Sequence, residues 1–87
     1  MAEYRIFIKP SAVKEADALP KKERQRIARK IQSLSDEPRS HGCEKLSGED
    51  KYRIRHGDYP ILYSISDQDL TAIVIKIRHR REVYRDR

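Results

Sequence analysis

The C-terminal stretch of residues 73–85 holds the side chains best suited to chemistry. It reads Ile-Val-Ile-Lys-Ile-Arg-His-Arg-Arg-Glu-Val-Tyr-Arg, an apolar strand pattern followed by a group of cations and a lone tyrosine. Isoleucines occupy the odd positions from 73 to 77, whereas Lys76, Arg78 and Arg80 have the opposite parity. A strand with this pattern would have one apolar and one cationic face. Such a cationic face predicts binding of phosphate groups.

Two further cations, Arg53 and Arg55, alternate with Tyr52 and Ile54. This period of two predicts a strand that begins near Lys51. Short turns separate it from two more predicted strands, residues 59–66 and 70–78, so the three should form an antiparallel meander. One face of the meander is expected to be the core, with Tyr52, Ile54, Ile61, Tyr63, Ile65, Ile73, Ile75 and Ile77. The other should be a basic, partly apolar groove with Arg53, Arg55, Leu62, Ser64, Val74, Lys76, Arg78 and Arg80.

The first twenty residues are expected to supply one strand and one short helix. Tyr4 to Lys9 is β-branched and aromatic and predicts a strand that ends before Pro10. Ser11 is a good N-cap for a helix over residues 12–19, since its hydroxyl can accept a backbone N–H of the first turn. Residues 39–50, which contain two glycines and two serines, are expected to form a loop.

Pro20 is expected to begin a second helix that extends to about Ser35. Ile27, Ile31 and Leu34 follow at i, i+4 and i+7, and this apolar stripe would pack on the sheet. The basic residues around the stripe are interpreted as the solvated side of the helix rather than as a binding surface. The order strand, helix, helix and three-stranded antiparallel meander predicts one α+β domain over residues 1–87, with both helices on one face of the sheet.

The composition restricts the partners. The formal net charge is +6, which favours an anionic partner, nucleic acid before membrane. No stretch approaches the roughly 20 apolar residues of a membrane-spanning helix. The one cysteine, Cys43, excludes an intramolecular disulfide and fits a reducing cytoplasm, where we expect the protein to act. The three histidines and this cysteine lack the spacing of metal ligands, so neither a metal nor another cofactor is expected.

The residue pattern offers little support for several reaction classes. Gly42 and Gly48 lack the strand-to-helix context of a nucleotide-binding loop. No serine, histidine and aspartate order suggests acyl transfer, and the acidic residues are scattered through predicted turns and helices. Hydrolysis by paired carboxylates or by a metal is therefore not favoured. Phosphate chemistry by cations remains.

Three segments carry a resemblance to a known family: Gly57-Asp58-Tyr59, Ile61-Leu62-Tyr63 and the ending Arg78-His79-Arg80-Arg81-Glu82-Val83-Tyr84-Arg85. With the predicted order of elements, the chain resembles the RelE/ParE superfamily of toxins from type II toxin–antitoxin systems over nearly its whole length. The ending is the most specific part and favours the RelE branch. That branch implies a small RelE-like fold and cleavage of messenger RNA in the ribosomal A site without a metal.

The resemblance also implies roles for individual residues. It places Arg80 at the family's transition-state arginine and Tyr84 at its C-terminal tyrosine, which stacks on or orients the substrate base. Arg53 and Arg55 fall where RelE-like toxins carry a pair of basic residues, commonly lysines. Pro60 falls where many members have another arginine, a departure that removes one cation from the site.

The residue types agree with the chemistry that the resemblance implies. When a 2′-hydroxyl attacks the neighbouring phosphate, negative charge builds on the phosphoryl oxygens, and fixed guanidinium groups stabilise it. Arginine is too basic to be an efficient proton acceptor. His79 is therefore assigned as general base or acid, with Tyr84 second. Binding of the RNA backbone is expected of Lys51, Lys76, Arg78 and Arg81.

Non-catalytic roles for the same residues remain as alternatives. Tyr84 could pack at the C-terminus, His79 could be an exposed residue at a strand end, and Arg80 could form a surface ion pair with Glu82 or Asp86. The partners implied are the ribosome with its mRNA and an acidic, partly disordered, RelB-like antitoxin. The alternatives in function are a ParE-like inhibitor of DNA gyrase and a non-enzymatic basic module that binds RNA, ribosome or DNA.

Overall fold

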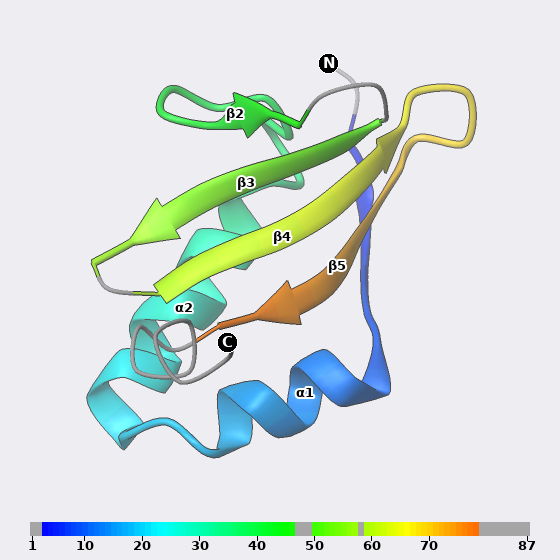
Figure 1. The fold of residues 1–87 in the computed structure, drawn as a ribbon. Helices are drawn as coiled ribbons and strands as arrows, with labels where there is room; N and C mark the ends of the chain where they lie inside the picture. Colours follow the sequence, from blue (N-terminus) through cyan, green and yellow to red (C-terminus); the bar gives the residue numbers. More distant parts are fainter. Residues whose placement is uncertain (1–2, 47–49, 58, 79–87) are drawn as a thin grey trace.

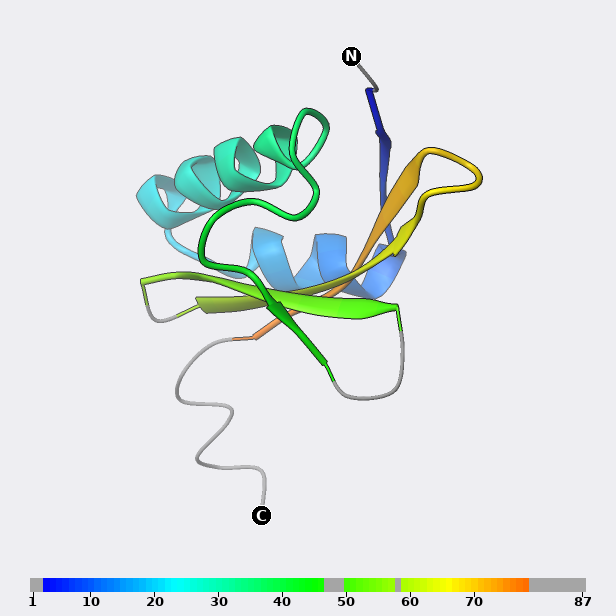
Figure 2. The ribbon, with the colours of Figure 1, turned by 90° about the horizontal axis from the view of Figure 1, so that it is seen from above.

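Two helices and five strands make up the part of the chain that the computed structural model describes, which is residues 3–46, 50–57 and 59–78. Both helices cover one face of a single mixed sheet (Figure 1, Figure 2). The expected α+β class, with the helices together on one face, is confirmed. The elements in chain order are β1 (Arg5–Ile8), α1 (Pro10–Asp17), α2 (Lys21–Ser33), β2 (Glu44–Lys45), β3 (Lys51–His56), β4 (Tyr59–Ser66) and β5 (Thr71–Ile77).

Proline marks the start of both helices. Pro10 is the first residue of α1, where its fixed φ suits the helix and its missing N–H is no loss. Lys9 is therefore the N-cap, without a side-chain hydrogen bond, and the prediction that Ser11 caps this helix was wrong. Pro20 is itself the N-cap of α2, one position before the first helical residue. The predicted stripe of α2 is buried: Ile27 is 1% exposed, Ile31 6% and Leu34 0%.

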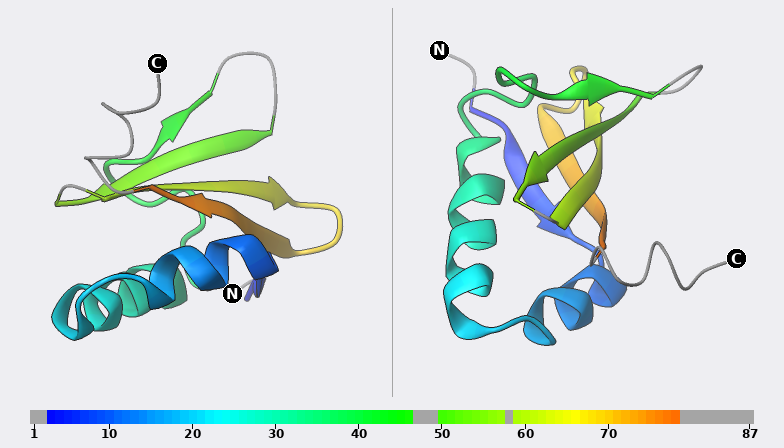
Figure 3. Two further views of the ribbon diagram at one scale, coloured as in Figure 1. Left: turned by 60° about the horizontal axis from the view of Figure 1, so that its bottom comes forward. Right: turned by 60° about the vertical axis from the view of Figure 1, so that its left-hand side comes forward.

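The sheet has the strand order β1-β5-β4-β3-β2. The predicted meander of β3, β4 and β5 is antiparallel throughout. Two features were not expected: β1 pairs in parallel with β5, and the short edge strand β2 pairs with β3 inside the segment predicted to be a loop. Figure 3 shows that α2 runs along the face of the sheet that the helices cover, and that α1 lies close to the end of β5.

A register shift interrupts the pairing of β4 with β5. Tyr63 pairs with Val74, but its neighbour Leu62 pairs with Lys76, so Ile75 is an extra residue on β5. Ala72 and Val74 are consequently in the core, each 0% exposed, and Ile73 is only half-buried and faces away from it. The expected alternation, with residues 73 and 75 inside and 74 outside, was wrong. Ile77 is in the core as predicted, 2% exposed.

The core lies between the helices and the inner face of the sheet. A cross-strand pair at its centre, Tyr52 and Tyr63, stacks with ring centroids 5.8 Å apart. The Tyr63 hydroxyl donates a hydrogen bond of 2.7 Å to the Pro38 carbonyl oxygen, which ties the segment after α2 to the middle of the sheet. No helix within the described residues is long and apolar enough to cross a membrane.

Candidate active site

The outer face of the sheet, which is the face turned away from the helices, carries the predicted cations. Arg53 on β3 lies opposite Leu62 on β4, and Leu62 lies opposite Lys76 on β5. Because neighbouring strands are about 4.8 Å apart, Arg53 and Lys76 start from backbone positions about 10 Å apart. A phosphodiester placed over Leu62 would therefore have a cation on each side.

A second row repeats this arrangement one step nearer the end of β5. Arg55 lies opposite Pro60, and the Pro60 carbonyl oxygen accepts a 3.0 Å hydrogen bond from the Arg78 N–H. Strand alternation puts Arg78 on the side opposite the buried Ile77, hence on the outer face. The two rows define a cation frame, by which we mean Arg53, Arg55, Lys76 and Arg78 around Leu62 and Pro60.

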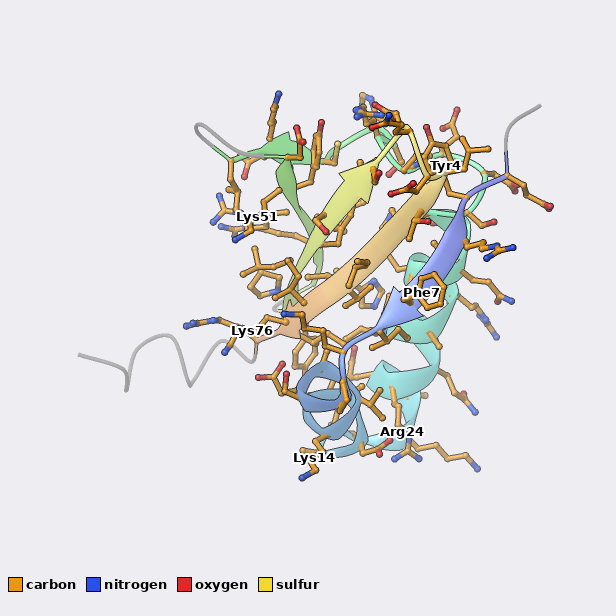
Figure 4. All side chains as sticks on the ribbon, turned by 90° about the vertical axis from the view of Figure 1, so that its right-hand side faces the viewer. Tyr4, Phe7, Lys14, Arg24, Lys51 and Lys76 are labelled. Carbon is orange, nitrogen blue, oxygen red and sulfur yellow. The ribbon has the colours of Figure 1, made fainter. Side chains whose placement is uncertain are left out.

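Lys51 lies in a third row, opposite Ser64, which in turn pairs with Ile73. Figure 4 shows Lys51 and Lys76 on the same side of the sheet, away from α2. The structure thus brings five predicted site residues to one face: Lys51, Arg53, Arg55, Lys76 and Arg78. The other four, His79, Arg80, Arg81 and Tyr84, lie outside the described residues.

The extra residue on β5 is what turns Lys76 outward. With an uninterrupted register from the Tyr63 and Val74 pair, Lys76 would lie opposite Ile61, which is 0% exposed in the core. An ammonium group there would lose its hydration at a large cost in free energy. The bulge moves Lys76 into the row of Leu62 and returns Ile77 to the core. The shape of the site thus depends on a backbone irregularity in β5.

An acidic side chain holds Arg53. The Nε and Nη2 atoms of Arg53 both donate to Oε1 of Glu44 on β2, at 3.1 and 2.5 Å. These hydrogen bonds hold the pKa of the Glu44 carboxyl below its ordinary value, and the nearby charge of Arg55 adds to the effect. The pair is solvent-exposed, with side-chain exposures of 36% and 61%, so its net contribution to stability is small.

A second acidic side chain, Glu15 on α1, approaches the other end of the same row. Its Oε1 accepts a 2.8 Å hydrogen bond from the Ile77 N–H, and its Oε2 is 3.9 Å from the Lys76 Nζ. Sequence reasoning missed both Glu15 and Glu44, because it treated the acidic residues as scattered through helices and turns. Glu15 carried no signal in the sequence, since only the packing of α1 against β5 brings it to the site.

His56, which directly follows Arg55 in the sequence, is directed elsewhere. Its Nε2 is 3.8 Å from Oε1 of Glu23 on α2, on the helix side of the molecule. Together with α2 it borders an open basic hollow of about 430 Å³, lined by Arg26, Arg29, Lys30, Ser33 and His56. Within residues 3–46, 50–57 and 59–78, no three His, Cys, Asp or Glu side chains group closely enough to hold a metal ion.

Comparisons with known proteins agree with this architecture. The family model described as "ParE toxin of type II toxin-antitoxin system, parDE" matches residues 6–84. No curated protein matches the chain. Among solved structures, the RelE–RelB complex of Pyrococcus horikoshii is similar with a TM-score of 0.81 and 32% identity, over 92% of this chain and 97% of that one.

Two bacterial structures are similar as well. The RelBE2 toxin–antitoxin complex of Mycobacterium tuberculosis has a TM-score of 0.80 and 25% identity, over 90% of this chain and 99% of that one. The isolated RelE toxin of E. coli has a TM-score of 0.76 and 27% identity, over 95% of this chain and 93% of that one. The family model covers most of the chain and the relatives are matched over nearly their whole length. The chain therefore belongs to the RelE/ParE superfamily of toxins of type II toxin–antitoxin systems.

Proposed function

We propose that this toxin is a ribosome-dependent mRNA endoribonuclease that inhibits translation in the cytoplasm. The observation that carries the proposal is the cation frame, in which Arg53 and Lys76 flank Leu62 while Arg55 and Arg78 flank Pro60. Cations on two sides of a phosphodiester match the charge that develops when phosphorus becomes five-coordinate. The similarity to RelE toxins supports the same activity.

In the proposed reaction the 2′-oxygen of a nucleotide forms a bond to its own 3′-phosphorus while the bond from phosphorus to the next 5′-oxygen breaks. The 2′-hydroxyl loses a proton and the 5′-oxygen gains one, so the products are a 2′,3′-cyclic phosphate and a 5′-hydroxyl. No metal takes part. Arg80, Arg53 and Arg55 hydrogen-bond the non-bridging oxygens, and Lys51, Lys76, Arg78 and Arg81 hold the RNA backbone. His79 is the general base or acid that transfers a proton, and Tyr84 is the second candidate for this role. The main role proposed for Tyr84 is to stack on the substrate base.

Dependence on the ribosome follows from what the frame supplies. It offers charge, because all four of its side chains are cations, and none of the four is a histidine or tyrosine that could exchange a proton near neutral pH. A carrier that holds the RNA in line for attack would supply the missing orientation, which is worth several orders of magnitude in rate. The test is to map mRNA ends in cells after induction of the toxin, with and without the neighbouring gene. Cuts at defined positions within codons, absent when the neighbour is co-expressed, support the proposal, and intact mRNA under growth arrest contradicts it.

Neutralisation by a cognate antitoxin is the second part of the proposal. The similar structures from Pyrococcus horikoshii and Mycobacterium tuberculosis are toxin–antitoxin complexes, and this chain offers an apolar groove of about 430 Å³ between β1, α1 and α2. Ile8 and Val13 on its rim are 40% and 42% exposed. An acidic, partly disordered, RelB-like protein with apolar anchors would fill it and meet the net charge of +6.

The groove can be tested by co-purification with the product of the neighbouring gene. Val13→Glu should weaken the complex by about tenfold or more, since it buries a carboxylate against apolar groups. Leu70→Asn is the matched control. Leu70 is also 42% exposed but lies outside the groove, and asparagine tolerates its φ of 50°. Equal retention of the neighbour by both variants would contradict docking in the groove.

Inhibition of DNA gyrase is a second candidate function, because the matching family model is that of ParE toxins. A supercoiling assay with purified gyrase separates it from RNA cleavage. A non-enzymatic basic module is the third, and the basic hollow on α2 favours it. It predicts strongly salt-dependent binding of RNA that remains intact.

A further inference from the structure

The end of β5 lies at a place where the sheet loses a strand. β1 accompanies β5 in parallel only as far as the pair of Ile8 and Val74, and the Lys9 N–H then donates to the Val74 carbonyl oxygen at 3.0 Å. At Pro10 the chain turns into α1. Among the described residues, the side of β5 beyond Val74 that faces away from β4 consequently has no strand partner.

Glu15 takes the place of the missing strand. Its Oε1 accepts the Ile77 N–H at 2.8 Å, a hydrogen bond that a carboxylate makes stronger than a neutral acceptor would. On the other side of β5 the next amide, that of Arg78, donates to the Pro60 carbonyl oxygen at 3.0 Å. Two consecutive peptide groups are therefore held from opposite sides, one by α1 and one by β4.

The second oxygen of the same carboxylate lies toward the cation frame. Glu15 Oε2 is 3.9 Å from the Lys76 Nζ, with side-chain exposures of 26% and 42%. Glu15 is itself held on a helix whose Ala12 is 0% exposed and whose Ala16 packs against the core. A rigid element thus fixes one carboxylate against both the backbone at the strand end and a cation of the frame.

We propose that Glu15 is a positioning residue of the site. It holds the last peptide groups of β5 and the Lys76 ammonium, so that the strand end presents Lys76 and Arg78 to the substrate in one fixed arrangement. The role rests on the proposed endoribonuclease function, in which Lys76 and Arg78 hold the RNA backbone. A purely structural role would make Glu15 a strand cap whose removal costs stability and nothing else.

The first arm of the test needs no ribosome. Amide hydrogen exchange at Ile77 is measured in the isolated toxin for the wild type, Glu15→Ala, Glu15→Gln and Asp17→Asn. We expect exchange at least about tenfold faster in Glu15→Ala and close to the wild-type rate in Glu15→Gln, whose amide oxygen still accepts the N–H. Asp17→Asn removes a charge from the same helix and should change nothing, because the hydrogen bond to the Ile77 N–H and the contact with Lys76 both belong to Glu15. Unchanged exchange in Glu15→Ala overturns the proposal.

The second arm measures single-turnover cleavage on programmed ribosomes. Glu15→Ala should lower the cleavage rate at saturating toxin by at least about tenfold, while the toxin concentration for half-maximal cleavage changes by less than about threefold. Glu15→Gln should recover most of the rate, because it keeps the backbone contact and loses only the charge beside Lys76. A wild-type saturated rate in Glu15→Ala, with faster exchange at Ile77, would make Glu15 a strand cap and overturn the proposal.

Folding and function can be told apart. If thermal melting shows that Glu15→Ala does not fold, Glu15→Asp replaces it. Its shorter side chain keeps the charge but should not reach Ile77 and Lys76 together, so the same loss of rate is expected and a wild-type rate overturns the proposal. Ribosomes that the wild-type toxin leaves uncut contradict the proposed function itself, whereas the exchange arm still decides whether Glu15 holds the strand.

Discussion

Glu44 and Arg53 form an ion pair at the edge of the cation frame, with the Nε and Nη2 atoms of Arg53 both directed at one carboxylate oxygen. The guanidinium proposed to meet phosphate is thus occupied by an internal anion. Since the pair is exposed, a phosphate oxygen can replace the carboxylate at little cost. In the proposed function, Glu44 therefore competes with RNA for Arg53.

This competition predicts that Glu44→Gln strengthens RNA binding. Loss of an exposed ion-pair partner is worth about 0.2–1 kcal/mol, so the affinity for a short RNA should rise by a factor of about 1.4 to about 5 at low salt. Fluorescence anisotropy of labelled RNA with the isolated toxin measures the change. Glu37→Gln is the control, an exposed acid of the segment after α2. Equal affinities of both variants would mean that Glu44 does not restrain Arg53.

Pro60 predicts a gain of activity. It lies between Arg55 and Arg78, at the position where the resemblance expects an arginine. Pro60→Arg would place a fifth cation within the frame and should raise single-turnover cleavage by about tenfold or more, below the 10²–10³ of a fully preorganised donor. Pro60→Ala is the control, because it removes the proline ring without adding a charge. If Pro60→Ala is as fast as Pro60→Arg, the charge is not the cause.

A pH-dependent contact ties the turn after β4 to the rest of the fold. Asp67 accepts hydrogen bonds from Arg39 at 3.0 and 2.9 Å and from the Tyr4 hydroxyl at 2.6 Å. These bonds, that of Arg39 first, lower the pKa of the Asp67 carboxyl. The Asp67 contacts therefore contribute fully to stability at pH values above about 4, the ordinary pKa of an aspartate carboxyl. This contribution is lost as the pH falls through the lowered pKa of the folded state.

Thermal melting of Asp67→Asn checks this sign. The variant should have a lower Tm than the wild type at neutral pH, and the difference should close as the pH falls below about 4 and through the lowered pKa of Asp67. Asp36→Asn, which removes an exposed carboxylate just after α2, should follow the wild type. A difference that persists undiminished at low pH would show that the charge of Asp67 is not what stabilises the fold.

The buried hydroxyl of Tyr63 predicts a loss of stability that is independent of charge. In Tyr63→Phe the Pro38 carbonyl oxygen, which accepts that hydroxyl at 2.7 Å, would lose its partner. A buried polar group left unpaired costs about 1–3 kcal/mol. Urea unfolding followed by circular dichroism should give a free energy of unfolding lower by that amount with an unchanged m-value. No loss would imply that water reaches the carbonyl.

Periodicity in the sequence was sufficient for the helices and the hairpin of β3 and β4. The i, i+4, i+7 stripe of α2 and the strict alternation from Tyr52 to Arg55 each allow one orientation only. Residues 73–75 were different, because Ile, Val and Ile can face the core in either parity and the sequence does not mark the extra residue. The bulge was therefore not predicted, and neither was its consequence that Val74, rather than Ile73, lies in the core.

The candidate site divides in the same way. Arg53 and Arg55 could be placed on one face from strand alternation, and Lys76 and Arg78 from their parity relative to Ile77, whereas Glu15 and Glu44 could not. Glu15 reaches β5 only through the packing of α1, and Glu44 belongs to a two-residue strand too short to leave a pattern. Contacts between segments far apart in the sequence leave no local signal, so the acidic partners of the site emerge only from the fold.

The chemistry of the cut on programmed ribosomes tests the proposed endoribonuclease function most directly. In the first arm, purified toxin is added to ribosomes stalled on a defined mRNA. In the second arm, the mRNA carries a single 2′-deoxynucleotide at the mapped cleavage position. In the third arm, the Arg80→Ala variant replaces the wild-type toxin on the unmodified mRNA. We predict cleavage with a 2′,3′-cyclic phosphate end, no cleavage at the deoxy position, and a rate about 10² lower for Arg80→Ala. Intact mRNA at every toxin concentration, or equal cleavage of the deoxy-substituted mRNA, would contradict it.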